Sequence, residues 1–270
     1  MSTSYEERKA QAQAAAPKDG KGKVVLAAAL VALLVLAAVA WAVLSQRSHQ
    51  SDTEAKIAGA TSPPNANKDG SGIVVNPGKA KPGAPTLVVY QDFQCPICKH
   101  VEDVVGPTIN DMADKGEITL EYRIRSFLDG NLERGGQVPH PKSSLRAAAA
   151  ASCADAAGVF RAYHDQVFKA QPTKEGDGYT DQQLTETFAK GAGLSGDQLA
   201  GFQSCVKDKK MEGFATKMET EGGKAGNSGT PQFLVNGKDL KDTLLMPAIQ
   251  AAQAAQKMDP AVIRKAILGR

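Results

Sequence analysis

Two cysteines, Cys95 and Cys98, stand at the start of a predicted helix. Thr86 to Phe93 is rich in β-branched and aromatic residues and predicts a buried strand. Residues 96–114 carry apolar side chains at helical spacing. Pro96 falls at the first helical position, where its missing N–H costs nothing. This order of strand, turn and helix puts Cys95 at or beside the N-cap of the helix.

A cysteine at a helix N-terminus is unusually acidic. The thiolate is the reactive form, and the ordinary pKa of a free thiol is about 8.5. Unsatisfied N–H groups and the positive end of the helix dipole favour the anion, and Lys99 and His100 add positive potential in the same turn. We therefore expect Cys95 to be the exposed, attacking sulfur. Cys98 should be the more buried, resolving sulfur of a pair that cycles between dithiol and disulfide.

A static disulfide or half of a zinc site could use the same pair. Zinc normally takes four ligands, often from a second Cys-x-x-Cys or a paired histidine motif. Cys153 and Cys205 are far apart in sequence, and His100, His140 and His164 show no tight ligand spacing. The sequence therefore favours redox chemistry that requires neither a metal nor an organic cofactor.

The N-terminal part of the chain contains one long apolar run, Val24 to Leu44, which has no charged residue. As a helix it would be about 31 Å long, close to the roughly 30 Å thickness of a bilayer core. Basic residues are concentrated before it, so the positive-inside rule keeps residues 1–23 as a cytoplasmic tail. The prediction is a single-pass anchor at the cell membrane. The alternative is a signal peptide cleaved after Ala38-Val39-Ala40, which gives a secreted protein.

Both alternatives place residues 45–270 outside the cytoplasm. Residues 45–84 are rich in Ser, Gly, Pro, Ala and Asn and predict a flexible linker, in which Gly72 to Val75 could form a short edge strand. The 270-residue chain has a net charge of +3 and 5% aromatic residues, which argues against a nucleic-acid-binding face. Its remaining apolar content suits one packed core.

Cys153 and Cys205 fall in segments predicted as helices. Two unpaired thiols would be a liability in an oxidising compartment, so we expect a structural disulfide. Closing the loop of about 50 residues between them stabilises a protein by about 4 kcal/mol in the chain-entropy model. A second redox pair that relays electrons is the alternative, but nothing beside either cysteine indicates an activated thiolate.

Three motifs resemble those of the DsbA-like thiol–disulfide oxidoreductases of the thioredoxin superfamily, in particular the membrane-anchored forms of Gram-positive and actinobacterial species. They are Gly72-Ile-Val-Val75, Tyr90-Gln-Asp-Phe-Gln-Cys-Pro-Ile-Cys98 and Gly229-Thr-Pro-Gln-Phe-Leu-Val-Asn-Gly237. The resemblance implies an α/β thioredoxin fold made of residues 85–140 and 223–270. A helical insertion, residues 141–222, would interrupt it. The N-terminal anchor, residues 24–44, would precede it.

The resemblance also implies roles for the third motif and for the residues between the cysteines. The Thr230–Pro231 bond should be cis, and the Thr230 backbone should lie beside Cys95 and pair with substrate. Pro96 and Ile97 are the active-site neighbours. The implied activity is the introduction of disulfides into reduced exported proteins, followed by reoxidation by a quinone-linked membrane partner.

The sequence departs from this family at two positions. Many members have His where this chain has Ile97, which puts an extreme oxidising potential in doubt. Many members have an acidic residue where this chain has Val89. Asp92 is nearby, and we expect it to be solvent-exposed rather than a substitute for that acid.

Two other functions use the same sites. A disulfide reductase or isomerase would share the cysteine pair, although residues 45–71 are too short and polar for the dimerisation domain that isomerases of this superfamily usually carry. A non-enzymatic chaperone or metal-delivery module on the same fold is the other alternative. The reduction potential separates oxidase from reductase.

Overall fold

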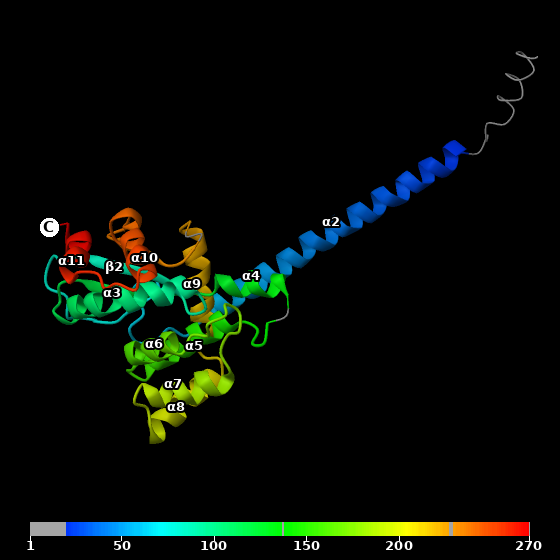
Figure 1. Cartoon of the computed structure of the whole chain (residues 1–270). Helices are drawn as coiled ribbons and strands as arrows, with labels where there is room; N and C mark the ends of the chain where they lie inside the picture. Colours follow the sequence, from blue (N-terminus) through cyan, green and yellow to red (C-terminus); the bar gives the residue numbers. More distant parts are fainter. Residues whose placement is uncertain (1–19, 137, 227–228, 270) are drawn as a thin grey trace, which may run out of the picture. The chain divides into compact units, whose positions relative to one another are not determined.

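The computed structural model describes residues 20–136, 138–226 and 229–269 (Figure 1). The chain divides between Glu54 and Ala55 into two compact units. In its described part the first unit consists of helix α2 (Gly20–Ala58), whose last residues belong to the second unit. Residues 1–19 of the predicted tail lie outside the described residues, and residues 20–23 are already helical.

The apolar run of helix α2 is not packed against any other described residues. Its large side chains from Val24 to Leu44 are exposed, and Trp41 is 76% exposed. By length and composition the helix is able to cross a membrane. It continues to Ala58, so the prediction of a flexible linker is wrong for residues 45–58. This segment contains no Gly or Pro before Gly59, and extending an existing helix is much easier than starting one.

The rest of the predicted linker is partly fixed to the domain. Asn76 is buried, and its amide nitrogen donates to the carbonyl oxygens of Ala113 at 3.0 Å and Ile118 at 2.8 Å. Its amide oxygen accepts a bond from the Leu120 N–H at 3.0 Å. Strand β1 (Ile73–Val74) pairs antiparallel with the next strand in the sheet, which confirms the predicted edge strand.

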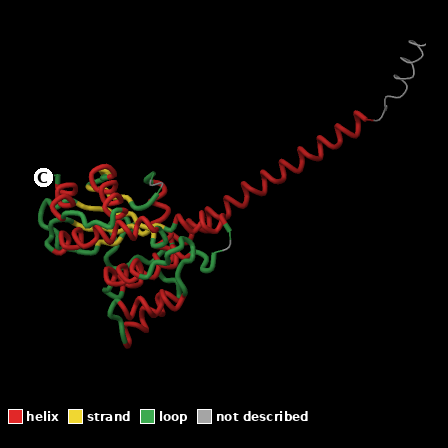
Figure 2. The backbone as a smooth tube through the Cα atoms, in the orientation of Figure 1, coloured by secondary structure: helices red, strands yellow, loops and turns green. Residues whose placement is uncertain are grey.

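The core of the second unit is a five-stranded sheet in the order β1-β3-β2-β4-β5 (Figure 2). Strands β2 (Thr86–Asp92) and β3 (Thr119–Arg125) are parallel, whereas β4 (Gln232–Val235) is antiparallel to β2. The turn Asn236-Gly237 leads into β5 (Lys238–Asp239), and both turn residues have positive φ, as a tight hairpin requires. Four consecutive residues of β2, from Val89 to Asp92, are buried. Since neighbouring side chains point to opposite faces, both faces of the sheet are covered.

The helices of the second unit fall into two groups. Helix α3 (Pro96–Asp114) packs with α10 (Met246–Gln253) and α11 (Pro260–Leu268). A larger group lies between β3 and β4 in the chain, and α5 and α9 of this group contact β3. Its members are α4 (Phe127–Gly135), α5 (Ser143–Ala156), α6 (Phe160–Lys169), η1 (Gln183–Thr187), α7 (Phe188–Gly191), α8 (Gly196–Lys207) and α9 (Glu212–Lys224), while η2 (Lys241–Leu245) precedes α10.

Helix α3 covers the residues 96–114 that the sequence predicts as helical. Pro107 lies inside α3, and the helix continues past it to Asp114. Thr180 and Gln183 form a capping box, because each side chain bonds the backbone N–H of the other. Ser195 is the N-cap residue of α8, but its side chain makes no capping hydrogen bond.

A disulfide joins Cys153 in α5 to Cys205 in α8, with the Cα atoms 5.9 Å apart. The pairing and the distance are those that the sequence predicts. The two cysteines are 52 residues apart in the chain, so the bond closes a long loop inside the helical insertion.

Removing this disulfide should destabilise the second unit without changing Cys95. For Cys153→Ser/Cys205→Ser we expect the free energy of unfolding to fall by about 4 kcal/mol, because the unfolded chain regains loop freedom. Urea unfolding of the full chain measures this change, and the alkylation rate of Cys95 serves as the control. An unchanged unfolding curve together with altered Cys95 reactivity would instead indicate an electron relay.

Gly106 in α3 makes room for a buried carboxyl group. A Cβ at this position would lie 2.2 Å from Glu102 Oε1 and 2.8 Å from its Cδ. Glu102 is itself fixed, since its Oε2 accepts a bond from Gln91 Nε2 at 2.5 Å. Burial raises the pKa of this carboxyl group.

Gly106→Ala should therefore destabilise the protein by about 1–3 kcal/mol, although alanine is the better helix former. Gly201→Ala in α8 is the matched control, because its Cβ would meet no atom within 4 Å and should stabilise the helix by up to about 1 kcal/mol. Urea unfolding of both variants tests the contrast. In a Glu102→Ala background the cost of Gly106→Ala should disappear, and its persistence would show that another contact is responsible.

Candidate active site

Cys95 lies at the junction of β2 and α3. Strand β2 ends at Asp92 and α3 begins at Pro96, so Cys95 is the N-cap residue, with extended backbone angles of φ −77° and ψ 115°. Pro96 occupies the first helical position, as the sequence predicts. The first free N–H groups of α3 therefore face the Cys95 sulfur.

The surroundings of Cys95 lower the pKa of its thiol to about 6. The largest cause is a hydrogen bond from the Cys98 thiol, followed after an opposing burial effect by the backbone N–H of Cys98. The Thr230 side chain and the Ile97 N–H also favour the thiolate. At pH 7 most of the reduced protein thus carries a negative charge on this sulfur, as the helix N-terminus predicts.

Cys98 has the opposite character. Its side chain is fully buried, and burial next to the Cys95 sulfur raises its pKa well above the ordinary thiol value. The pair therefore consists of one acidic and one protonated thiol. Cys95 is less exposed than predicted, at 6%, because the proline loop and the insertion cover it, whereas Ile97 is 46% exposed.

The proline loop lies against the same sulfur. The Thr230–Pro231 bond is cis, as predicted, and Cys95 Sγ is 3.5 Å from the carbonyl oxygen of Thr230. The Thr230 Oγ1 atom is buried and makes no hydrogen bond of full geometry among the described residues, so its O–H is available to the Cys95 thiolate. The structure therefore brings together Cys95 and Cys98 with Thr230 and Pro231, two pairs from distant parts of the chain.

The turn between β2 and α3 is held by two residues of the insertion that the sequence did not identify. Gln171 Nε2 donates to the carbonyl oxygens of Phe93 at 2.7 Å and Cys95 at 3.0 Å. The Tyr179 hydroxyl also donates to the Phe93 carbonyl, at 2.7 Å. No local motif marks either residue, because each reaches the turn only through the tertiary fold.

The prediction of a solvent-exposed Asp92 is wrong. Its side chain is fully buried because residues of the insertion cover the end of β2. Its Oδ1 lies 2.5 Å from Ser144 Oγ and accepts the Gln94 N–H at 2.9 Å. Burial raises the pKa of this carboxyl to about 8, and the nearby carboxyl of Asp129 acts in the same direction. Asp92 thus links the active-site turn to the start of α5.

One group among the described residues has ligand types that could hold a metal ion. Atoms of Glu102, His164 and Asp165 lie within 4.8 Å of one another. His164 Nε2 is 2.8 Å from Gln91 Oε1, and the amide nitrogen of Gln91 bonds Glu102, so the two buried members already have protein partners. The arrangement is that of a hydrogen-bonded core network.

The family model described as "Thioredoxin" matches residues 78–262, so the chain belongs to the thioredoxin family. Among solved structures, MdbA from Corynebacterium diphtheriae, a thiol–disulfide oxidoreductase, is 24% identical with a TM-score of 0.54 over 69% of this chain and 92% of that chain. Reduced DsbG from Mycobacterium tuberculosis, a disulfide bond oxidoreductase, is 25% identical with a TM-score of 0.53 over 75% of this chain and 95% of that chain. MdbA from Actinomyces oris is 18% identical with a TM-score of 0.55 over 74% and 89%. No curated protein matches the chain.

These similarities show the fold, and the geometry of the cysteine site indicates the chemistry. An acidic thiol at a helix N-terminus, a buried second thiol and a cis-proline loop beside them are the parts that thiol–disulfide exchange requires. The fold and the site together define a DsbA-like thiol–disulfide oxidoreductase of the thioredoxin superfamily, with a helical insertion as the sequence predicts.

The hydrogen bond from Cys98 should control the acidity of Cys95. Cys98→Ala removes the donor, so the pKa of Cys95 should rise clearly above 6. Cys98→Ser keeps a donor in the same place and should change the pKa much less. The pH dependence of thiolate absorbance near 240 nm measures both values. Equal pKa values in the two variants would assign the shift to the helix N–H groups alone.

Proposed function

We propose that this protein introduces disulfide bonds into exported proteins, with Cys95-Pro96-Ile97-Cys98 as its catalytic motif. The reaction starts from the oxidised Cys95–Cys98 pair. A substrate thiolate attacks the Cys95 sulfur, the bond between the two cysteines breaks, and Cys98 leaves and takes up a proton. A second substrate thiolate then attacks the substrate sulfur of the mixed disulfide and displaces Cys95 as a thiolate. The substrate loses two electrons and the cysteine pair gains them.

The low pKa of Cys95 is the observation that supports oxidation of substrates over their reduction. A sulfur whose pKa is about 6 is a good leaving group, which favours the second step. A reductase would instead need Cys98 to attack the mixed disulfide, and its raised pKa leaves little thiolate for that step. Stabilising the reduced form through Cys95 by about 1–2 kcal/mol at pH 7 also makes the pair more oxidising by about 30 mV.

The proline loop supports the binding of an extended substrate. Beside Cys95, the Thr230 backbone belongs to the loop that enters β4, and a substrate segment there could pair with it. Ile97 is exposed next to the sulfur and offers an apolar contact. Thr230 and Pro231 are therefore the proposed substrate-binding residues, and Pro96 and Ile97 shape the approach.

The proposed location follows from α2 and from the chemistry. Val24 to Leu44 would anchor the protein in the cell membrane as a single span, with residues 1–23 in the cytoplasm and the second unit outside, where disulfides persist. If the segment is cleaved, the protein is secreted. The reduced pair would pass its electrons to a quinone-linked membrane oxidase, and the catalytic cycle requires no metal or organic cofactor.

The reduction potential of the Cys95–Cys98 pair tests the direction. We expect a value between those of thioredoxin, about −270 mV, and DsbA, about −120 mV, because the pKa of Cys95 lies between the values of their acidic cysteines. Equilibration of the full chain with glutathione buffers gives the potential. A value at or below that of thioredoxin would favour the reductase.

Two variants at one position test the electrostatic reason. Ile97→His places a cation beside the thiolate when protonated, which should lower the pKa of Cys95 and raise the potential. Ile97→Leu preserves the apolar contact and should leave both values unchanged. In parallel, oxidised protein should restore activity to reduced, unfolded ribonuclease, and Cys95→Ser should abolish this effect. A Cys95→Ser variant that still promoted refolding would support a chaperone.

A further inference from the structure

The helical insertion contains a cavity that the cysteine chemistry does not use. Its volume is about 560 Å³, within the range of pockets that bind small molecules. Helices α5 and α8 and the segment η1 line it, and we call it the insertion cavity. Its apolar lining consists of Leu145 and Ala149 from α5, Leu184 from η1 and Val206 from α8.

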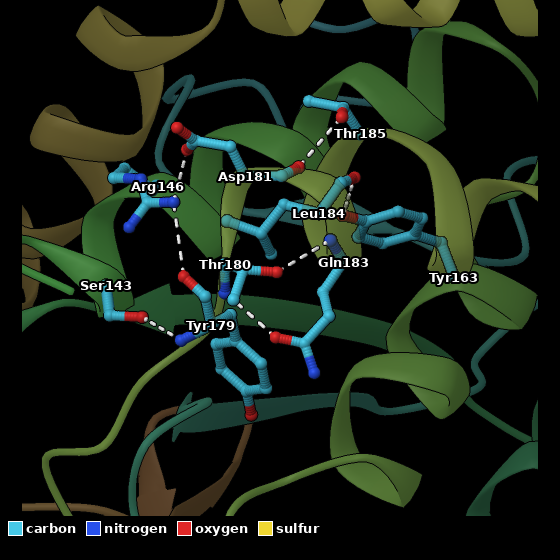
Figure 3. Close-up of polar contacts among 9 residues, drawn as sticks. All are labelled: Ser143, Arg146, Tyr163, Tyr179, Thr180, Asp181, Gln183, Leu184 and Thr185. Atoms are coloured by element: carbon cyan, nitrogen blue, oxygen red, sulfur yellow. Dashed lines mark hydrogen bonds and ion pairs between the residues drawn. The ribbon is translucent and has the colours of Figure 1, made fainter. Parts of the chain in front are cut away.

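The charged residues of the insertion cavity have an excess of positive charge. Asp181 is paired with Arg146, as Figure 3 shows. Glu212 is paired with Lys56 at 2.9 Å and with Lys209 at 3.7 Å. Among the described residues, the other two lining cations, Lys142 and Lys207, form no ion pair. An anion could therefore bind here without displacing an existing pair.

The wall around Leu184 is rigid. Arg146 Nη2 also donates to the Tyr179 carbonyl at 3.2 Å, and the Tyr163 hydroxyl donates to the Leu184 carbonyl at 2.7 Å (Figure 3). The capping box of Thr180 and Gln183 fixes the start of the same segment. Leu184 is almost completely buried. These contacts fix one wall of the cavity in place, which lowers the ordering cost of binding a ligand there.

The walls also restrict the class of ligand. They are mainly helical, so their backbone groups are already bonded and offer no edge for an extended peptide. A flexible alkyl chain with one anionic end matches both the apolar lining and the two lysines.

We propose that the insertion cavity binds a long-chain fatty acid. The alkyl chain lies against Leu145, Ala149 and Val206, and the carboxylate pairs with Lys142 or Lys207 of the lining. This binding function is separate from thiol–disulfide exchange, since the cavity lining contains no cysteine and neither Thr230 nor Pro231. A test of fatty-acid binding is therefore independent of a test of the proposed oxidase activity.

Photolabelling in membranes tests the proposal on the full chain. Membranes containing the protein are irradiated with a palmitic acid analogue that carries a diazirine in its alkyl chain, and labelled peptides are identified by mass spectrometry. We expect labels in α5, η1 and α8. Unmodified palmitate should compete at least fivefold better than hexadecanol, which has the same chain without the charge.

Matched variants separate binding from unfolding. Lys142→Glu/Lys207→Glu should reduce labelling of the insertion at least fivefold, and Ala149→Phe should reduce it by filling the cavity. Lys210→Glu/Lys241→Glu changes two exposed lysines outside the cavity and should have no effect. The reactivity of Cys95 shows that each variant is folded. Labels confined to α2, equal competition by hexadecanol, or stronger labelling by a diazirine phospholipid would each overturn the proposal.

Discussion

The structure depends on satisfying the backbone of the short turn between β2 and α3. The carbonyl group of Phe93 belongs neither to a strand ladder nor to a helix, and this part of the chain is buried. The carbonyl group of Cys95 accepts the first backbone bond of α3, from the Lys99 N–H at 3.3 Å. A buried carbonyl without a partner costs about as much as a lost hydrogen bond. Gln171 and Tyr179 supply the partners. The insertion is therefore a structural requirement of the active-site turn, because the sheet and α3 alone leave the Phe93 carbonyl unsatisfied.

A second constraint concerns which buried side chains carry a negative charge. Burial raises the pKa of Cys98, Asp92 and Glu102 above their ordinary values, because it disfavours the charged form of each. Cys95 is the exception, since donors from Cys98 and from the N-terminus of α3 outweigh the cost of burying its charge. The anion is concentrated on the one sulfur that faces the proline loop.

The sequence predicted the parts of the site that local rules control. Strand β2, the N-cap position of Cys95 and the helix after Pro96 follow from residue types and spacing, and the family motif added the cis-proline loop. It did not predict the burial of Asp92, because that depends on Ser144 and the turn before α5 covering the end of β2. It also did not predict that α2 continues to Ala58. Composition suggested a linker there, but helix propagation from an existing apolar helix prevailed.

The two cysteine pairs differ in their backbone surroundings more than in their burial. Cys153 and Cys205 lie inside α5 and α8, where the nearby N–H groups are already bonded within the helix. Neither position therefore offers the free N–H groups that stabilise a thiolate at a helix N-terminus. Cys95 precedes its helix and receives the free N–H groups of the first turn. Position relative to a helix end thus explains why the same residue type can form a permanent crosslink in one place and an exchangeable bond in the other.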